Sequence, residues 1–327
     1  NGQQVFNMPT LMRCTNGTVL NMEGGSQLVV DHGSTLRLEA GSWLQMAGGS
    51  NLHVRNGGRL EIMPGAILKL ANGAHVHIEE GPDASMDGRL IYHPGAIIRL
   101  DGTTSELAFA GILEIKDNAS FQVVSNVSSL YTKGLIRFNS TRPISQNVVA
   151  GANSRFIVRS NSLFQRVLLV DQESLYGPAQ LVEFSLISVS AVLNSNARIV
   201  PPVTNACAIK VINARVTSPG APNNHRGYRL NGQQQVTLQG SRFERGSYGM
   251  YAFNPTLGNT PHVNDCEFAD CGIGFYSMGK AVSVNASLFK TCKAGLLAEQ
   301  VSQTSQIIQS AANGNQTGIF VQGAASL

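Results

Sequence analysis

Glycine recurs at every eighth residue from Gly25 to Gly81, and this octad constrains the fold more than any other feature of the chain. The first residue after each glycine is small, and the third and fifth are apolar. The apolar pairs are Leu28/Val30, Leu36/Leu38, Leu44/Met46, Leu52/Val54, Leu60/Ile62, Leu68/Leu70 and Val76/Ile78. Such alternation indicates short strands buried on one face, and the glycines provide the bends between them. Repeated strands without a helical pattern predict a solenoid.

The charges indicate how many octads make one coil. Two octads per coil would align Arg37 with His53 and Lys69 at the strand spacing of about 4.8 Å, which places like charges together. Three octads align Arg37 with Glu61 instead. A second outward column would then hold Asp31, Arg55 and Glu79. The alternating signs favour three octads, so we expect a coil of about 24 residues.

Three similar pentapeptides support this coil length. GRLIY, GILEI and GLIRF begin at Gly88, Gly111 and Gly134, at intervals of 23 residues. We expect these glycines to lie in one column. The predicted fold class is therefore all-β, a right-handed single-stranded parallel β-helix with about 23 to 24 residues in each three-sided coil.

A solenoid is one quasi-linear unit, so we expect a single domain over residues 1–327. We expect residues 1–24 to open and cap the helix, 25–102 to form regular coils, 103–235 irregular coils with loops, and 236–327 a second set of repeats. Asn118 and Asn153 stand where the pattern has glycine, and asparagine tolerates a left-handed backbone. The last residues end in a strand-like segment without a polar cap, so we expect the chain to be truncated there.

Composition excludes some function classes. Charged residues make up 13% of the chain, and the net charge of +4 is spread without a basic run, so nucleic acid is not an expected partner. No stretch approaches the 18 apolar residues that a membrane span needs. The first residues lack the features of a signal peptide, so we expect any such leader to have been removed or to lie outside this sequence.

A second repeat follows in the C-terminal part: phenylalanine, five residues, glycine and an apolar residue. The copies are Phe243 to Met250, Phe268 to Phe275 and Phe289 to Leu296, and a degenerate copy runs from Ala312 to Ile319. From about Val236 onward the chain resembles the right-handed parallel β-helix repeat family, which includes pectate-lyase-like proteins and bacterial cell-surface solenoids. The octads are also similar to those of secreted Bacteroidota-type proteins. The resemblance implies the fold, but the family contains both enzymes and inert stalks.

Catalytic members of that family imply calcium-binding aspartates and a basic residue. The candidates here are Asp265, Glu267 and Asp270, with Lys280 and Lys290 near in sequence. The alternative is a structural ladder, because Glu267 falls one coil above Arg242 and Lys290 falls in the column that begins with Glu244. The polygalacturonase-like motifs are not present in the sequence.

Other candidates lie outside this group. His225 and Arg226 lie in a segment rich in proline and asparagine, and loops on a rigid solenoid often carry function. Trp43 should point outward in one column with Ile67, as a sugar platform or a subunit contact. His53 and His77 should stack on one outer face near His75, but no third metal ligand has suitable spacing, so we expect neither a metal nor a cofactor.

Five cysteines are too few for a disulfide scaffold. Cys271 and Cys292 should stack on adjacent coils, either as a disulfide or as two thiols. Acceptor sequons for N-glycosylation occur at Asn16, Asn118, Asn126, Asn139, Asn285 and Asn315.

These observations favour a non-enzymatic β-solenoid, secreted or at the cell surface, that forms a structural or adhesive segment of a larger exported protein. The expected partners are a polysaccharide or components of the cell surface or secretion machinery. The alternative is a polysaccharide lyase or glycoside hydrolase with its groove beside residues 215–235.

Overall fold

The computed structural model describes residues 3–6, 9–82, 84–100, 106–125, 135–138, 148–150, 154–160, 166–170, 175–176, 181–193, 198–200, 207–218, 225, 227–231, 235–253, 260–279, 281–301 and 305–323. The elements in these ranges are β-strands and the short 3-10 helix η1 (Ala84–Met86). The strands of the described residues pair in parallel, which confirms the predicted β-solenoid, for example in β4 (Gln27–Val30), β7 (Asn51–Val54) and β10 (His75–Ile78). Among the described residues, no helix has the length and apolar character to cross a membrane. The chain divides into two compact units, residues 1–169 and 170–327.

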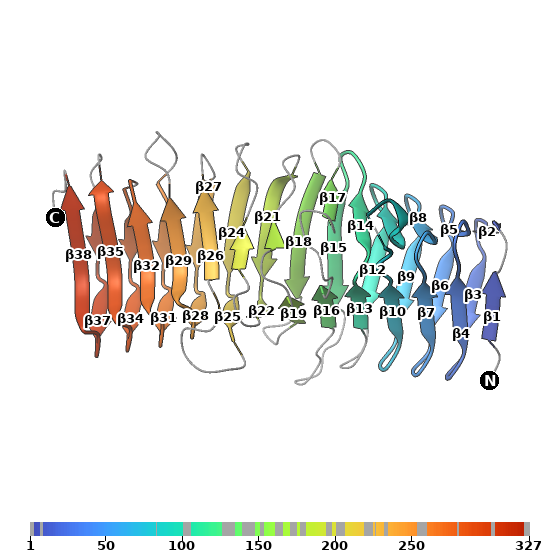
Figure 1. Ribbon diagram of the computed structural model, residues 1–327, viewed down its shortest axis with the longest axis horizontal. Helices are drawn as coiled ribbons and strands as arrows, with labels where there is room; N and C mark the ends of the chain where they lie inside the picture. Colours follow the sequence, from blue (N-terminus) through green and yellow to red (C-terminus); the bar gives the residue numbers. More distant parts are fainter. Residues whose placement is uncertain are drawn as a thin grey trace. The chain divides into compact units, whose positions relative to one another are not determined.

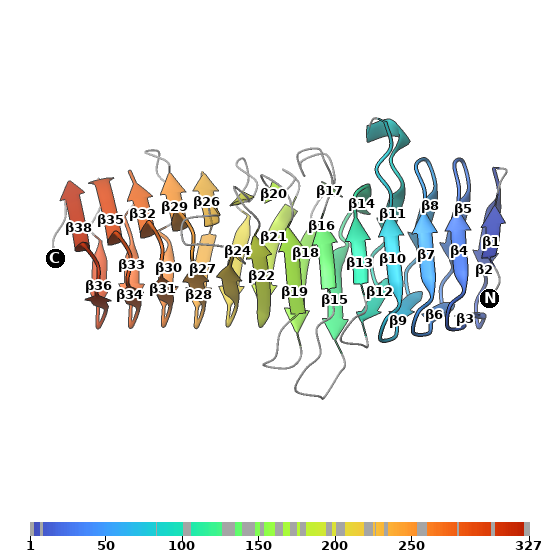
Figure 2. The same cartoon turned by 60° about the horizontal axis from the view of Figure 1, so that its bottom comes forward.

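Successive strands of the first unit belong in turn to three parallel sheets, whose members lie side by side in Figures 1 and 2. The first sheet contains β1 (Gln3–Phe6), β4 (Gln27–Val30), β7 (Asn51–Val54), β10 (His75–Ile78), β13 (Glu106–Phe109), β16 (Leu135–Phe138) and β19 (Arg166–Val170). The second contains β2 (Leu11–Cys14), β5 (Thr35–Leu38), β8 (Arg59–Ile62), β11 (Arg89–Tyr92), β14 (Ile112–Ile115) and β17 (Val148–Ala150). The third contains β3 (Val19–Met22), β6 (Trp43–Met46), β9 (Ile67–Leu70), β12 (Ile97–Leu100), β15 (Ser120–Ser125) and β18 (Ser154–Ser160).

The predicted register of three octads per coil is confirmed in the octad region. Leu36 pairs with Leu60, and Arg37 pairs with Glu61. Leu36 and Leu60 are fully buried, as is Leu113 on a later coil, because the apolar residues of each strand fill the interior. The register already holds between β1 and β4, so the segment expected as a cap begins as a regular coil.

The octad glycines adopt the left-handed backbone that their turns require. Gly25, Gly33, Gly41, Gly49, Gly57, Gly65 and Gly73 have φ between 73° and 79°. Asn118 has φ of 59°, which confirms that asparagine replaces glycine there, whereas Asn153 lies outside the described residues. A side chain at Gly57 would also collide with the ring of His32, at 2.1 Å from its Nδ1 atom. Glycine is therefore needed for the backbone conformation of these turns, and at Gly57 a side chain would also require the exposed His32 ring to move.

Two expectations about the coils were wrong. First, the octads are interrupted after Gly81 by η1, so Arg59 pairs with Arg89, which lies farther along the chain than three octads. Second, the three pentapeptides do not share one column. Gly88 and Gly111 are neighbours, since the Ile112 N–H donates to the Gly88 carbonyl at 2.9 Å, but the strand after Gly134 pairs with β13 and not with β14. The described strands between Gly111 and Gly134 are β14 and β15, so this interval does not complete the three sides of a coil.

The second unit also contains three parallel sheets. The first, called the β28 sheet, contains β22 (Val189–Leu193), β25 (Arg215–Thr217), β28 (Arg242–Glu244), β31 (Glu267–Ala269), β34 (Leu288–Lys290) and β37 (Ala311–Asn313). The second, the β29 sheet, contains β20 (Leu175–Tyr176), β23 (Arg198–Val200), β26 (Gly227–Asn231), β29 (Tyr248–Phe253), β32 (Ile273–Met278), β35 (Ala294–Val301) and β38 (Thr317–Gly323). The third, the β27 sheet, contains β21 (Leu181–Ile187), β24 (Ala208–Ile212), β27 (Gln235–Gln239), β30 (His262–Asn264), β33 (Ser283–Asn285) and β36 (Gln306–Ile308).

Phenylalanine rings form the core of this unit. Phe243, Phe268 and Phe289 are fully buried and in register, with ring centroids 5.0 and 5.1 Å apart. The column continues to Ala312, as the degenerate fourth motif predicted. Each motif therefore adds one ring to an interior stack.

Candidate functional site

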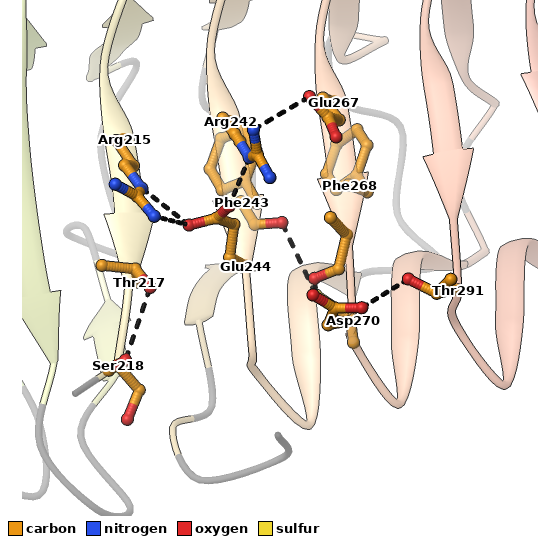
Figure 3. A network of polar contacts seen from close by, with 12 residues as sticks. Arg215, Thr217, Ser218, Arg242, Phe243, Glu244, Glu267, Phe268, Asp270 and Thr291 are labelled. Atoms are coloured by element: carbon orange, nitrogen blue, oxygen red, sulfur yellow. Dashed lines mark hydrogen bonds and ion pairs between the residues drawn. The ribbon is translucent and has the colours of Figure 1, made fainter. Parts of the chain in front are cut away.

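The acidic candidates of the second unit occupy different parts of each coil. Asp265 and Asp270 lie in turns with φ of 51° and 54°, and their N–H groups donate to carbonyl groups of the next coil. The Asp270 carboxylate also accepts a hydrogen bond from the Thr291 hydroxyl (Figure 3). Glu267 lies outward on β31, where its carboxylate is 3.5 Å from the Arg242 guanidinium. The contacts of Glu267 and Asp270 agree with the structural alternative, because both carboxylates bind side chains of a neighbouring coil, whereas the contact described for Asp265 is made by its backbone.

A buried carboxylate, Glu244, lies at the centre of this ladder. Its side chain is almost inaccessible, and its Oε2 atom lies 2.6 Å from Nε of Arg215 on the preceding coil. Its Oε1 atom contacts Arg242, which in turn reaches Glu267 on the following coil (Figure 3). A buried charge needs such partners, so removing one arginine is expected to destabilise the unit. The sequence predicted that Lys290 lies in the same column as Glu244, and the register confirms this prediction. Ala269 lies between them in the column, so Lys290 is two coils away from Glu244.

His225 is a packing residue in the structure, where the sequence suggested a loop site. Its ring is fully buried; Nε2–H donates to the Glu244 carbonyl at 2.7 Å, and Nδ1 accepts from the Gly227 N–H at 2.9 Å. Burial lowers the pKa of His225, which favours the neutral ring that these two bonds require. Arg226 and Lys280 lie outside the described residues.

The predicted histidine column is present on the first unit. His53 pairs with His77, and their ring centroids are 5.0 Å apart. Burial lowers the pKa of His77, and the neighbouring His53 lowers it further. His75 lies beside Glu106, with 3.5 Å between Nδ1 and the carboxylate. Within the described parts of the chain, no group of three or more potential ligands is placed to hold a metal ion.

Trp43 lies in the outward column that the sequence predicted. It pairs with Val19 on one side and Ile67 on the other, and Ile97 continues the column. Val19 and Ile97 are 50% and 39% exposed, and the two residues between them are partly exposed. The next outward column is polar, with Asn21, Gln45, Lys69 and Arg99. The apolar surface here is one residue wide.

A broader apolar surface lies on the second unit and was missed in the sequence. We call it the aromatic face: the outward side of β29, β32, β35 and β38. Its members are Tyr248, Tyr251, Phe253, Ile273, Tyr276, Met278, Ala294, Leu297, Glu299, Thr317 and Phe320. The sequence does contain a signal for its central column, because each of these residues lies two positions after the glycine of a repeat motif: Tyr251, Tyr276, Leu297 and Phe320.

The tyrosines of this face stack along the coil axis. The rings of Tyr251 and Tyr276 lie 5.1 Å apart with planes inclined by 24°, and Tyr276 donates to Glu299 at 2.8 Å. Burial and this bond raise the pKa of Tyr276 to about 12. At one margin of the face lies a groove of about 540 Å³, which crosses four coils and includes Tyr248, Ile273 and Lys293 in its lining.

The five cysteines are buried and free. Cys271 and Cys292 occupy equivalent corners on successive coils, since the Lys293 N–H donates to the Cys271 carbonyl, so the predicted stacking is confirmed. Contact with Cys292 and burial raise the pKa of Cys271, which favours the protonated thiol at Cys271. Asn315 ends the column, and its Oδ1 atom accepts from the Cys292 N–H at 2.7 Å.

In comparisons with known proteins, no family model, no curated protein and no solved structure matches the chain.

Proposed function

We propose that this chain is a structural and adhesive β-solenoid segment of an exported protein, and that it acts through its outer surfaces without catalysis. The observation that carries the proposal is the way in which its charged side chains are used. Glu61 lies 2.7 Å from Arg37 on one coil and 2.9 Å from His93 on another, and Arg55 lies 3.1 Å from Asp31. Such pairs connect coils along the axis, and a solenoid is stabilised by these nearest-neighbour contacts.

The second unit supports the same function. Arg215, Glu244, Arg242 and Glu267 form one chain of ion pairs across three coils. Glu244 is the buried member, and its bonds hold coils together; in this arrangement its carboxylate is not available to a substrate. A surface built in this way suits a rigid support for binding.

Composition supports an exported location. The outer positions are rich in serine, asparagine and glutamine, and only 13% of residues are charged. The parallel β-solenoid itself is common to stalks and to enzymes, so the fold gives no preference between them. The choice of an adhesive role depends on the apolar surfaces, above all the aromatic face, because contiguous exposed apolar patches mark interaction sites.

An adhesion assay combined with a turnover assay tests the proposal. Beads coated with the chain are passed over immobilised acidic polysaccharides and over surfaces coated with the chain itself, and released sugars are measured in parallel. We expect retention on at least one surface, without release of unsaturated or reducing sugars. The control is a triple variant, Asp265→Ala with Glu267→Ala and Asp270→Ala, which should retain binding.

The opposite result would identify an enzyme. Release of unsaturated or reducing sugars by the native chain, lost in the triple variant, would replace the adhesive function with a polysaccharide lyase or hydrolase. Absence of retention on every surface would also contradict the proposal. Stability of the triple variant should fall only slightly, since exposed ion pairs contribute at most about 1 kcal/mol each.

A further inference from the structure

The aromatic face differs from the other two outer surfaces of its unit. On the β28 sheet, one outward column holds Arg215, Arg242 and Glu267, and on the β27 sheet the outward residues include Asn264 and Asn285. Over β29, β32, β35 and β38, the outward side holds mainly tyrosine, phenylalanine and aliphatic residues in three adjacent columns, with Thr317 and Glu299 as the polar members. A solvated sheet face is normally polar, so this face is suited to contact with another apolar surface.

The ring geometry favours a protein surface over a sugar as the occupant. Tyr248 and Tyr276 have ring centroids 6.1 Å apart with planes inclined by 25°, and Tyr251 and Tyr276 are also stacked. Each ring therefore covers the flat side of its neighbour and presents its edge outward. A sugar stacks on the flat side of an aromatic ring, whereas ring edges and the aliphatic side chains of Ile273 and Leu297 pack well against a second apolar sheet.

The charges at the margins indicate a second copy of the same chain. Lys293 is exposed directly before β35, and Glu299 lies near the other end of the same strand. A two-fold axis that lies between two facing copies, parallel to the coil axis, reverses the strand direction and preserves the order of coils. Lys293 of each copy then meets Glu299 of the other, and Leu297 lies within one residue of the axis, near the centre of the contact.

We propose that the aromatic face is a self-association surface, which pairs with the same face of a second copy about this two-fold axis. This proposal rests on the proposed adhesive function and identifies the adhesion partner as a second copy of the chain. Four strands spaced about 4.8 Å apart, each with six residues that rise about 3.3 Å per residue, give the aromatic face an area of roughly 400 Å² per copy. Standard interfaces bury about 800 Å² per partner, so single copies pair weakly and arrays of copies pair strongly through avidity.

Sedimentation equilibrium over a concentration series tests the pairing. We expect the native chain to show a reversible monomer–dimer equilibrium. Leu297→Glu buries a carboxylate in the interface and should weaken dimerisation at least about tenfold. Leu288→Glu is the matched control, because Leu288 is an outward, partly exposed leucine of the same coil on the β28 sheet and should leave the dimer intact. Circular dichroism melting confirms that both variants are folded.

A charge-swap mixture tests the two-fold axis itself. Lys293→Glu and Glu299→Lys should each dimerise at least about tenfold more weakly, because like charges then meet at both margins. An equimolar mixture of the two variants should restore dimerisation, because each lysine meets a carboxylate again. Simple loss of packing would not be rescued by mixing, so restoration distinguishes the proposed arrangement from a structural effect.

Three outcomes would overturn the self-association. In the first, the native chain stays monomeric at its highest soluble concentration. In the second, Leu288→Glu weakens dimerisation as much as Leu297→Glu does. In the third, the mixture of Lys293→Glu and Glu299→Lys does not restore dimers. A monomeric chain whose Leu297→Glu variant no longer binds an immobilised polysaccharide would identify the face as a glycan site. That result would overturn the pairing and leave the adhesive function standing.

Discussion

Replacing Phe268 by alanine tests the ring stack of the second unit. Phe268 is fully buried between Phe243 and Phe289, with centroids 5.0 and 5.1 Å away, and Phe275 lies 6.2 Å from it. Removing a buried phenylalanine ring costs about 3 to 5 kcal/mol through lost burial and the cavity left behind. Each lost aromatic pair contributes about 0.5 to 1.5 kcal/mol beyond burial. Phe268→Ala should therefore lie near the upper end of this range.

Phe289→Ala provides the matched comparison. Phe289 is equally buried, but its column neighbours are Phe268 on one side and Ala312 on the other. It loses one of these ring pairs where Phe268 loses three, so we expect a cost about 1 to 3 kcal/mol smaller than that of Phe268→Ala. Ala312→Phe should extend the stack by one ring pair and increase the cost of Phe289→Ala by about 1 kcal/mol.

Urea unfolding followed by circular dichroism measures these costs. The comparison requires equal m-values, because a solenoid can unfold in parts and a changed slope would signal such behaviour. A cost below about 2 kcal/mol for Phe268→Ala would refute the reasoning, since it lies outside the range for a packed ring. So would a Phe289→Ala cost equal to or greater than that of Phe268→Ala.

Three further predictions concern the first unit, the buried histidine and the thiols. Leu60→Asp should lower the melting temperature severely, because a buried carboxylate without a partner costs several kcal/mol, and a melt within a degree or two of the parent would contradict this. The lowered pKa of His225 means that the unfolded chain binds the proton more readily than the folded chain does. The contribution of the neutral His225 ring to folding stability is therefore complete above the ordinary pKa of 6.5 and is lost as the pH falls below that value. Urea midpoints between pH 7.5 and 5 should therefore fall less in His225→Gln than in the parent, and equal slopes would exclude this role. Burial raises the pKa of Cys207 to about 12 and that of Cys266 to about 11, so a thiol reagent should label them slowly in the native chain and rapidly in urea; rapid native labelling would show that they are accessible.

The octads made much of the first unit predictable. Their apolar alternation, glycine spacing and alternating charges all come from local sequence, and they led to the pairing of Arg37 with Glu61. The position of Gly134 was not predictable in the same way, because equal spacing does not reveal how many strands an interval contains. Spacing identifies a column only where every coil has the same three strands.

The candidate site was less predictable, because partners from other coils decide what a residue does. Nothing local to Glu244 indicates that two arginines from different strands make it a buried ion-pair centre. His225 followed a polar segment, yet its environment is set by Gly227 and by the carbonyl of Glu244. The aromatic face became visible only when the four strands were aligned.

The corner that holds η1 shows how this scaffold accommodates added sequence. Arg59 and Arg89 pair directly although more than three octads separate them, while the preceding coil uses three, so the extra segment leaves both neighbouring strands in place. Longer loops add little closure entropy, and corners at the surface are the usual sites for insertions. For protein engineering, this corner is a natural position at which to graft a foreign peptide. In evolution, the same tolerance lets corner loops diversify while the coils that carry them stay unchanged.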